Sequence, residues 1–364
     1  MCGIIKDVRG MLKKFPLPVL TFLLLSYCTE EKPDIHVVCE NLEGNYHIKW
    51  ETFPPMKGTV SIYESINPDS FDIQAPLAIV NISDGFKNVF AIRNLRRSYF
   101  KLVFNRKYSV ITAERAVPMQ QLTNFRDFGG YYNENNLQTQ WGKLYRSSSL
   151  NYATTIDMKF LSALKIKTVI DFRSDDEKFK DPYRYNASQT FNLPLRENPH
   201  STFFFYDKIL SKRMRKNDVI IAQQDNLAFV MEHNADYFEQ MFDILADKTN
   251  YPIVFSCALG KDKTGVAAAL ILSALSVDRE QIISDFLLSN RLTDYDFFLP
   301  NLEVYYSDVD VQETMTAMLS SHQEVITYIL DRVTKQCGSM DKFLENELKL
   351  SPQKRAKLKE IMLY

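Results

Sequence analysis

The sequence has few cysteines and few histidines, and their spacing suits neither a metal site nor a disulfide framework. Five cysteines stand at Cys2, Cys28, Cys39, Cys257 and Cys337, without a C-x-x-C pair, and only five histidines are scattered along 364 residues. Zinc sites need closely spaced Cys and His ligands, and disulfide-rich folds carry denser, paired cysteines. We therefore expect no metal ion, no cofactor and no disulfide scaffold.

Net charge is also nearly absent. Lys and Arg number 44 against 45 Asp and Glu, so the formal net charge is -1. Nothing in this balance favours binding to nucleic acid. Apolar residues make up 45% and charged residues 24% of the chain, which is enough to bury sizeable cores. A chain of this length is more typical of two domains than of one.

The apolar run near the N-terminus, residues 15–25, is too short to span a bilayer. Lys13 and Lys14 precede it, whereas Pro16 and Pro18 would break a buried helix. A charged segment followed by a short apolar segment is typical of an export signal. The signal is more regular when read from Met11, which we take as an alternative start.

The end of this run, Leu25-Ser26-Tyr27-Cys28, resembles a bacterial lipoprotein signal, in which the cysteine is acylated after cleavage. Tyr27 departs from the pattern, which prefers a small residue at that position. The resemblance implies that residues 1–28 are a signal peptide and that Cys28 is lipidated. It also implies membrane anchoring on the extracytoplasmic side of the cell envelope. A cleaved soluble signal and an uncleaved anchor are the alternatives.

Residues 29–115 are predicted to form a small all-β domain. Apolar and polar residues alternate at 46–50, 59–63, 88–92, 100–104 and 108–111, and turn-forming residues such as Asn67-Pro68-Asp69 and Asp84-Gly85 separate them. Short alternating strands at this spacing are typical of an antiparallel sandwich. The pattern resembles a fibronectin type III or immunoglobulin-like module. Such a module is either a spacer or a glycan- or protein-binding domain.

Residues 116–364 alternate strand-like apolar runs with helical patterns, which predicts an α/β domain with a mostly parallel central sheet flanked by helices. We expect strands at 167–171 and 252–255 and helices at 228–245 and 266–275. Between the second strand and the last helix lies S-C-A-L-G-K-D-K-T-G, residues 256–265. A strand, a tight glycine-bounded loop and a buried helix form a cradle for phosphate.

Cys257 begins this loop, and Lys263 follows it six residues later. A thiolate and a cation at that spacing can face each other across an anion held by the loop. The amide groups and the helix N-terminus also lower a thiol pKa, so we expect a thiolate at neutral pH. The alternative is an ordinary buried thiol at the end of a core strand.

The loop resembles the H-C-x-x-G-K-D-R-T-G signature of the atypical bacterial tyrosine phosphatases. Other segments resemble that family in the same order: N-F-R-D-F-G-G at 124–130, L-Y-R-S at 144–147, V-I-D-F-R-S at 169–174 with Glu177, and D-F-L-L-S-N at 285–290. Together they span residues 118 to about 350, which is nearly all of the second domain.

Two positions in the loop depart from the family pattern. Ser256 stands in place of its His, and Lys263 stands in place of its Arg. Arg donates two parallel hydrogen bonds to phosphate oxygens, whereas Lys provides charge without that planar fork. Losing one such donor typically costs on the order of 10²–10³ in rate. The site is therefore a weak enzyme, one with a changed substrate, or a phosphate-binding pseudoenzyme.

The resemblance implies a role for each residue of the loop. Cys257 attacks phosphorus, Lys263 holds the phosphate oxygens, and Asp262 is the general acid and then the base that activates water. The phosphate also contacts loop residues Ala258, Leu259, Gly260, Lys261, Thr264 and Gly265, with Lys261 able to reach a second phosphate and Thr264 donating to the sulfur. Surrounding residues orient the loop or form structural ion pairs instead: Arg126, Asp127, Asp171, Arg146 and Arg173.

A helical lid is implied at residues 195–235, where the basic stretch 208–216 suits an anionic substrate such as a phosphotyrosine protein or a phosphoinositide. An ordinary amphipathic helix on the core is the alternative. Three functions remain open from the sequence. They are a phosphate monoester hydrolase acting on phosphotyrosine, an inactive phosphate-binding pseudophosphatase, and a surface adhesion lipoprotein.

Overall fold

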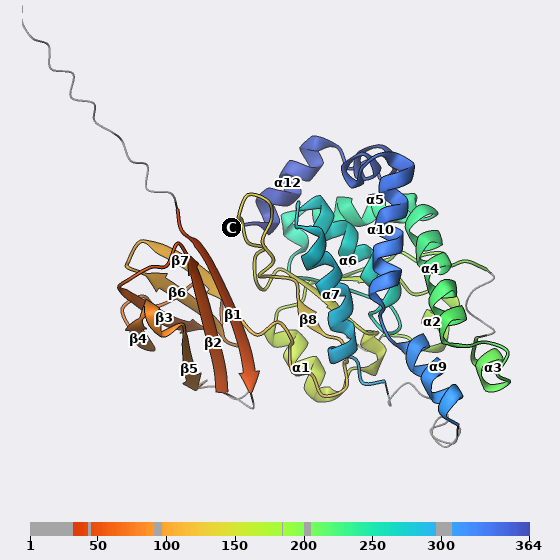
Figure 1. Ribbon diagram of the computed structural model, residues 1–364, viewed down its shortest axis with the longest axis horizontal. Helices are drawn as coiled ribbons and strands as arrows, with labels where there is room; N and C mark the ends of the chain where they lie inside the picture. The colour runs from red at the N-terminus through yellow and green to blue at the C-terminus, as the bar shows by residue number, and fades with distance from the viewer. Residues whose placement is uncertain (1–31, 43–44, 91–96, 184, 200–204, 296–307) are drawn as a thin grey trace, which may run out of the picture. The chain divides into compact units, whose positions relative to one another are not determined.

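The structure is a computed structural model that describes residues 32–42, 45–90, 97–183, 185–199, 205–295 and 308–364 (Figure 1). The predicted signal peptide and Cys28 lie outside the described residues. From Asp34 to Tyr364 the chain forms one compact unit. Within the parts that the structure describes, no helix combines the length and the apolar character needed to cross a membrane.

The first part of this unit is an antiparallel sandwich of two sheets. One sheet has the order β1-β2-β5 and the other the order β4-β3-β6-β7. The strands are β1 (Asp34–Leu42), β2 (Asn45–Phe53), β3 (Thr59–Ser65), β4 (Ala78–Asn81), β5 (Phe86–Phe90), β6 (Tyr99–Phe104) and β7 (Tyr108–Thr112). The all-β sandwich predicted from the alternating pattern is therefore present.

Alternate residues of these strands form the core of the sandwich. Trp50, Ile62 and Phe104 are among the buried residues of this cluster, and the Trp50 indole donates to the Ile82 carbonyl oxygen at 2.8 Å. The sequence pattern did not reveal β1 or β4. In β1 the buried Ile35 and Val37 alternate as expected, but Val38 is 57% exposed, and this outward apolar side chain obscures the period of two.

The second part contains a five-stranded sheet of order β11-β10-β12-β9-β8. Its strands are β8 (Arg126–Asp127), β9 (Leu144–Ser147), β10 (Thr168–Asp171), β11 (Gln189–Asn192) and β12 (Ile253–Ser256). All neighbouring pairs are parallel except β8 with β9. The carboxyl ends of β9, β10 and β12 therefore meet at one edge, where ligands bind in open α/β sheets.

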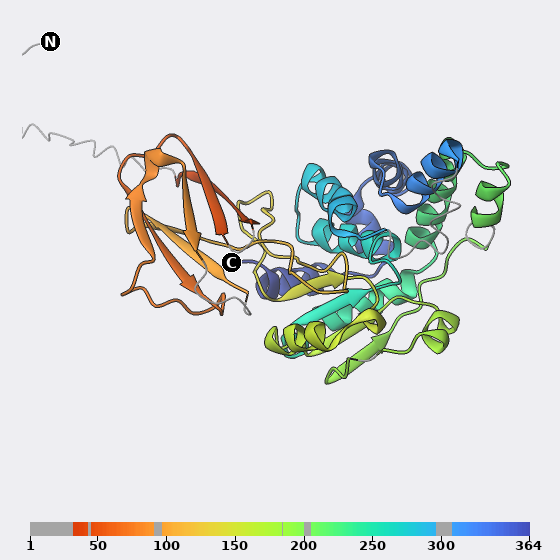
Figure 2. The ribbon, with the colours of Figure 1, turned by 90° about the horizontal axis from the view of Figure 1, so that it is seen from below.

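Helices cover both faces of this sheet (Figure 2). Ile253 and Phe255 pack on one face with α4 (Lys216–Glu232), α5 (Ala235–Leu245) and α6 (Asp262–Ala274). Val254 packs on the other face with Leu161 of α1 (Thr155–Ala163). Successive side chains of a strand point to opposite faces, so a sheet buried on both sides has a continuous apolar run. The mostly parallel α/β architecture predicted from sequence is thus observed.

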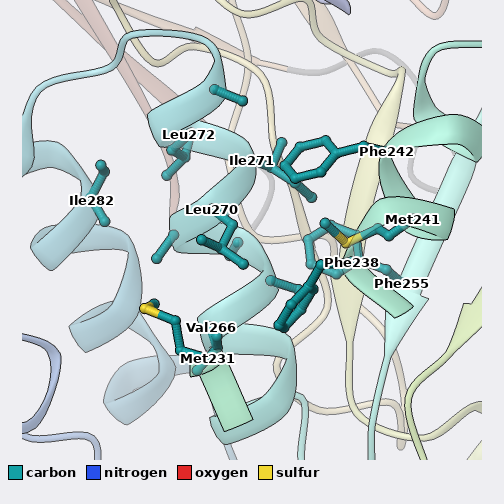
Figure 3. Close-up of a cluster of buried hydrophobic side chains, with 14 of the residues drawn as sticks. Met231, Phe238, Met241, Phe242, Phe255, Val266, Leu270, Ile271, Leu272 and Ile282 are labelled. Atoms are coloured by element: carbon teal, nitrogen blue, oxygen red, sulfur yellow. The ribbon is translucent and has the colours of Figure 1, made fainter. Parts of the chain in front are cut away.

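Helix α6 lies at the centre of the larger core (Figure 3). Apolar side chains from β12, α4, α5 and α7 (Arg279–Leu292) surround it, among them Phe255, Met231, Phe238, Met241, Phe242 and Ile282. A helix buried on all sides is fixed in place. The loop that precedes α6 therefore has a rigid element at each end.

The helical segment expected at 228–245 is two helices, α4 and α5. They are separated at His233 and Asn234, where the Asn234 amide donates to the Val230 carbonyl oxygen at 2.8 Å. Asn favours such local hydrogen bonds over a continuing helix. The remaining described helices are α2 (Asp175–Lys180), α3 (Phe205–Leu210), α9 (Val309–Leu319), α10 (Gln323–Cys337), α11 (Met340–Lys342) and α12 (Pro352–Met362).

Candidate active site

The loop between β12 and α6 presents backbone amides that make no hydrogen bond to the described part of the chain. Cys257 follows β12 directly and is 6% exposed, and α6 begins at Asp262. Among the described residues, no carbonyl or side chain accepts a hydrogen bond from the amides of residues 258–261. Free amides beside a helix N-terminus provide donors and positive potential for an anion.

The carbonyl groups of the same loop are held outward by neighbouring segments. The Ser149 amide donates to the Ala258 oxygen at 3.0 Å. The Asn124 side-chain amide donates to the Leu259 and Gly260 oxygens at 3.1 and 2.9 Å. The Arg146 guanidinium donates to the Gly260 oxygen at 2.8 Å. Fixing the carbonyl groups on the outside leaves the amide groups facing inward.

Gly260 is required by this geometry. Its φ is +66°, and a Cβ at this position would lie 2.2 Å from the Ser147 carbonyl oxygen. Both the left-handed conformation and the close approach exclude a side chain. Gly265, which the sequence placed with the phosphate ligands, instead lies inside α6. A Cβ there would be 2.8 Å from the Phe286 ring, so this glycine allows α6 and α7 to pack closely.

The Cys257 thiol is not activated as the sequence predicted. Burial raises the pKa of Cys257 above its ordinary value, although Thr264 and the charge of Lys263 act in the opposite direction. The expectation of a thiolate at neutral pH is therefore wrong for the free loop. Removing a sulfur anion from water costs more than the Thr264 hydrogen bonds and the nearby ammonium group recover.

Lys263 binds two carboxylates at the edge of the loop. Its Nζ lies 3.1 Å from Glu197 Oε2 and 3.5 Å from Glu177 Oε2, and its side chain is 6% exposed. Burial alone would lower the pKa of Lys263, but Glu197 and Glu177 more than offset it, so the pKa lies above its ordinary value. Lys263 is therefore a charged group at the position where the resemblance places the phosphate-binding cation.

Asp262, the predicted general acid, is 34% exposed at the N-terminus of α6 and accepts a hydrogen bond from Lys261 Nζ at 2.9 Å. The Lys261 side chain does not face the loop interior. Its Nζ, which is 1% exposed, also lies 3.4 and 3.3 Å from the carbonyl oxygens of Met318 and Ser320. Lys261 therefore positions Asp262 near the end of α9, and its ammonium group is held by that carboxylate and the two carbonyl oxygens.

Two buried arginines, Arg126 and Arg146, hold the loop in place through hydrogen bonds and ion pairs. Arg126 Nε donates to Asp285 Oδ1 at 3.1 Å, and Arg146 pairs with Oδ2 of the same carboxylate. The Tyr131 hydroxyl also donates to Asp285 Oδ1, at 2.7 Å. Burial would raise the pKa of Asp285, but the two guanidinium groups hold it well below its ordinary range. Arg126 also donates to Asn124 Oδ1, so both arginines connect Asp285 to the loop.

Asp127 lies away from the loop. Its carboxylate accepts hydrogen bonds from the amides of Gly129 at 2.8 Å and Gly142 at 2.9 Å, and pairs with Arg97 at 3.2 Å. It therefore ties the segment after β8 to the residues that precede β6. The sequence placed Asp127 among the residues that orient the loop, and the structure gives it this different set of partners.

Asp171 and Arg173 form a buried pair behind the loop. Arg173 donates to both oxygens of Asp171, at 3.0 Å from Nη2 to Oδ2, and its guanidinium stacks 4.2 Å from the centre of the Tyr183 ring. The Tyr183 hydroxyl lies 2.8 Å from Ser256 Oγ. Ser256, which replaces the family's histidine, is therefore connected through Tyr183 to this ion pair.

Two basic residues of the predicted lid are paired with acids at the neighbouring helix α9. Helices α3 and α9 lie side by side (Figure 1), and Phe205, Ile209 and Met315 share a small core with Val219 of α4. Two lysines of the basic stretch pair with acids at the start of α9 or within it: Lys212 with Asp308 at 2.6 Å and Lys216 with Glu313 at 3.1 Å. These two charges are directed at α9. Residues 200–204 lie outside the described chain.

Four residues of the site were not assigned by sequence reasoning. Asn124, Asp285 and Glu177 lie in segments whose family resemblance was noted, but nothing in their spacing indicated which atoms they bind. Glu197 gave no signal at all. It follows β11 and reaches Lys263 only through the tertiary fold. A resemblance of segments identifies candidate positions, whereas the carboxylate partners of Lys263 depend on packing.

Comparisons with known proteins place the second part of the chain in a family. Residues 117–364 match the model of the tyrosine phosphatase family. A protein of Cupriavidus necator named as a tyrosine-protein phosphatase is 31% identical over 178 residues, which cover 47% of this chain and 61% of that protein. The triple specificity protein phosphatase PtpB of Mycobacterium tuberculosis is 32% identical over 222 residues, which cover 53% of this chain and 74% of that protein.

Among solved structures, the core catalytic domain of the PP-IP phosphatase Siw14 from S. cerevisiae, in complex with citrate, aligns with 55% of this chain and 94% of that chain. The sequence identity is 12% and the TM-score is 0.28.

Proposed function

Since the chain belongs to the tyrosine phosphatase family over residues 117–364, we propose that it hydrolyses phosphate monoesters, with phosphotyrosine as the leading substrate, through a phosphocysteine intermediate. One observation supports this proposal most directly. Cys257 lies at the start of a loop whose carbonyl groups accept hydrogen bonds from neighbouring segments and whose amides at 258–261 have no acceptor among the described residues. Such a loop binds the phosphoryl oxygens and places phosphorus next to the sulfur.

The reaction proceeds in two displacements. Cys257 first loses its proton to solvent, and its sulfur attacks phosphorus. The phosphorus–oxygen bond to the leaving group breaks while Asp262 gives its proton to the leaving oxygen. Asp262 then takes a proton from a water molecule whose oxygen attacks phosphorus. The phosphorus–sulfur bond breaks, which releases inorganic phosphate and restores the thiolate.

Lys263 and the loop amides stabilise the charge on the phosphoryl oxygens in both steps. Lys donates single hydrogen bonds and cannot form the bidentate fork of Arg. We therefore expect a slow enzyme. The raised pKa of Cys257 also lowers the rate, because only the thiolate is nucleophilic at phosphorus.

The test is hydrolysis of p-nitrophenyl phosphate by the full chain across a wide pH range. We expect turnover in the wild-type protein and none in Cys257→Ser. The double variant Ser256→His/Lys263→Arg restores the family pattern, and we expect it to raise kcat by roughly 10²-fold. If wild type and double variant are both inactive while inorganic phosphate raises the melting temperature, the chain is a phosphate-binding protein without catalysis.

For its place in the cell, we propose lipid anchoring through Cys28 on the extracytoplasmic side of the envelope. The proposal is supported by the charged and apolar segments before Cys28 in the sequence. Metabolic labelling with a radioactive fatty acid tests it. Label in the wild-type protein that disappears in Cys28→Ser supports lipidation, and equal labelling of the two proteins contradicts it.

A further inference from the structure

At the edge of the loop, the lysines and the carboxylates differ in exposure. The side chains of Lys261 and Lys263 are 1% and 6% exposed, whereas those of Asp262, Glu197 and Glu177 are 34%, 32% and 39% exposed. Behind the loop, cations and carboxylates are buried together, as Arg173 is with Asp171 and as Arg126 and Arg146 are with Asp285. A substrate approaching the loop therefore meets carboxylates first.

Lys263 cannot offset this acidic edge. An ammonium group has three N–H donors, and the Lys263 ammonium has carboxylate oxygens 3.1 and 3.5 Å away. At most one donor remains for a bound phosphate. Glu177 Oε2 also accepts from the Ser174 amide at 2.7 Å, so its position is fixed by the first turn of α2. Lys263 and its two carboxylates together carry one negative charge.

Basic side chains next to these carboxylates are paired with other acids. Arg196, adjacent to Glu197 in the chain, binds Asp236 at 2.7 Å. Lys178, adjacent to Glu177, binds Asp175 at 2.8 Å. Lys212 and Lys216 bind acids at α9. The phosphate itself is attracted by the loop amides and the start of α6, whereas these four cations are already paired with other acids.

We propose that Glu197, together with Glu177, makes the site selective for phosphotyrosine peptides whose neighbouring residues are basic, and against phosphates with additional negative charge. This inference rests on the proposed function and names its substrate class. Lysine or arginine side chains beside the phosphotyrosine pair with the exposed oxygens of Glu197 and Glu177. Acidic neighbours, or the further phosphates of a polyanion, are repelled by the same carboxylates.

The test compares two phosphotyrosine peptides that differ only in whether lysine or glutamate flanks the phosphotyrosine on both sides. For the wild-type full chain we expect kcat/KM to be roughly 10-fold higher for the lysine peptide, because each exposed charge pair contributes only a few-fold. Most of the difference lies in KM. The preference weakens as salt is raised, since exposed charges are screened. Equal kcat/KM values, or a preference for the glutamate peptide, overturn the proposal.

Glu197→Gln keeps the shape of the side chain and a hydrogen-bond acceptor for Lys263 while removing the charge. We expect it to reduce the preference to about 3-fold, chiefly by lowering KM for the glutamate peptide. The matched control is Glu239→Gln, because Glu239 is 30% exposed and pairs with Lys349 at 2.9 Å away from the loop. This control keeps the wild-type preference. A change of the same size in both variants overturns the assignment to Glu197.

Binding measurements separate this inference from the proposed function. Cys257→Ser is titrated calorimetrically with the same two peptides, so turnover is not needed. Tighter binding of the lysine peptide supports the charge selection even if the wild-type protein hydrolyses no aryl phosphate, a result that would count against hydrolysis alone. Equal binding of the two peptides, or no binding of either, overturns the charge selection whatever the hydrolysis assay gives.

Discussion

At the residue scale, the site depends on which neighbouring groups offset the cost of burying the Cys257 thiol and the Lys263 ammonium group. Cys257 is surrounded by a core strand and the start of α6, and burial dominates its titration. Glu197 and Glu177 hold the pKa of Lys263 above its ordinary value, against the effect of burial. The sequence predicted both positions from one local segment. It predicted a thiolate at Cys257, whereas burial raises the pKa of that thiol. It did not predict the carboxylates that pair with Lys263, since they come from distant parts of the chain.

The thiol pKa gives a prediction at this scale. Because burial raises the pKa of Cys257, alkylation by iodoacetamide is expected to be slow at neutral pH and to rise through a midpoint above the ordinary thiol value of about 8.5. The rate is measured by mass spectrometry of the peptide that contains Cys257. Inorganic phosphate protects the thiol by occupying the loop. Fast alkylation at pH 6 would contradict the raised pKa.

The sign of the linked stability effect follows from the same shift. A group whose pKa is raised by folding contributes stability below its unfolded pKa, and this contribution is lost as pH rises through the folded value. Cys257→Ala is therefore expected to be less sensitive to alkaline pH than the wild-type protein.

At the scale of elements, β9, α7 and the segment after residue 123 hold the loop. Arg146 of β9 and Arg126 of β8 meet at Asp285 of α7, and Asn124 binds the loop oxygens directly. The strands and helices were largely predictable, because a buried parallel sheet and an apolar helix leave clear patterns. The meeting of the two arginines at one carboxylate was not, since three elements must pack before it exists.

Asp285→Asn tests this arrangement. The substitution removes the carboxylate that Arg126 and Arg146 share and leaves two buried cations without that compensation. We expect the free energy of unfolding to fall by about 3–5 kcal/mol, measured by urea denaturation. The control, Asp331→Asn, removes an exposed partner of Arg279 and should cost less than about 1 kcal/mol. Equal losses in the two variants would contradict a structural role for the Asp285 pair.

The pH dependence of this contribution has a definite sign. Because the two guanidinium groups hold the pKa of Asp285 well below its ordinary range, its stabilising effect is present above the unfolded value of about 3.9. It is lost only as pH falls toward the folded value. The difference in stability between wild type and Asp285→Asn should therefore shrink in strong acid.

At the scale of the whole molecule, the sandwich and the sheet domain share buried contacts within one compact unit. Arg97 pairs with Asp127 at 3.2 Å, and the hydroxyls of Tyr99 and Tyr145 lie 3.2 Å apart. The Trp141 indole donates to the Ile111 carbonyl oxygen at 3.0 Å. The boundary at residue 115, predicted from the change in sequence pattern, stays a prediction.

These contacts predict that residues 116–364 are less stable alone than in the full chain. The shortened protein loses Arg97, so Asp127 stays buried without its cation, and Trp141 becomes exposed. We expect a loss of roughly 3–5 kcal/mol and a melting temperature lower by about 10 °C. Arg97→Met in the full chain isolates the ion-pair contribution. An unchanged melting temperature for residues 116–364 would contradict the coupling.

Gly260 has a consequence for protein engineering. The loop approaches the end of β9 so closely that a single added carbon would overlap the Ser147 carbonyl group. Residues 256–265 alone therefore cannot be transferred to another protein scaffold and keep this loop conformation. A successful graft has to carry residues 147–149 along with the loop, and a library that varies the loop while keeping β9 constant should recover glycine at position 260 in nearly every folded clone.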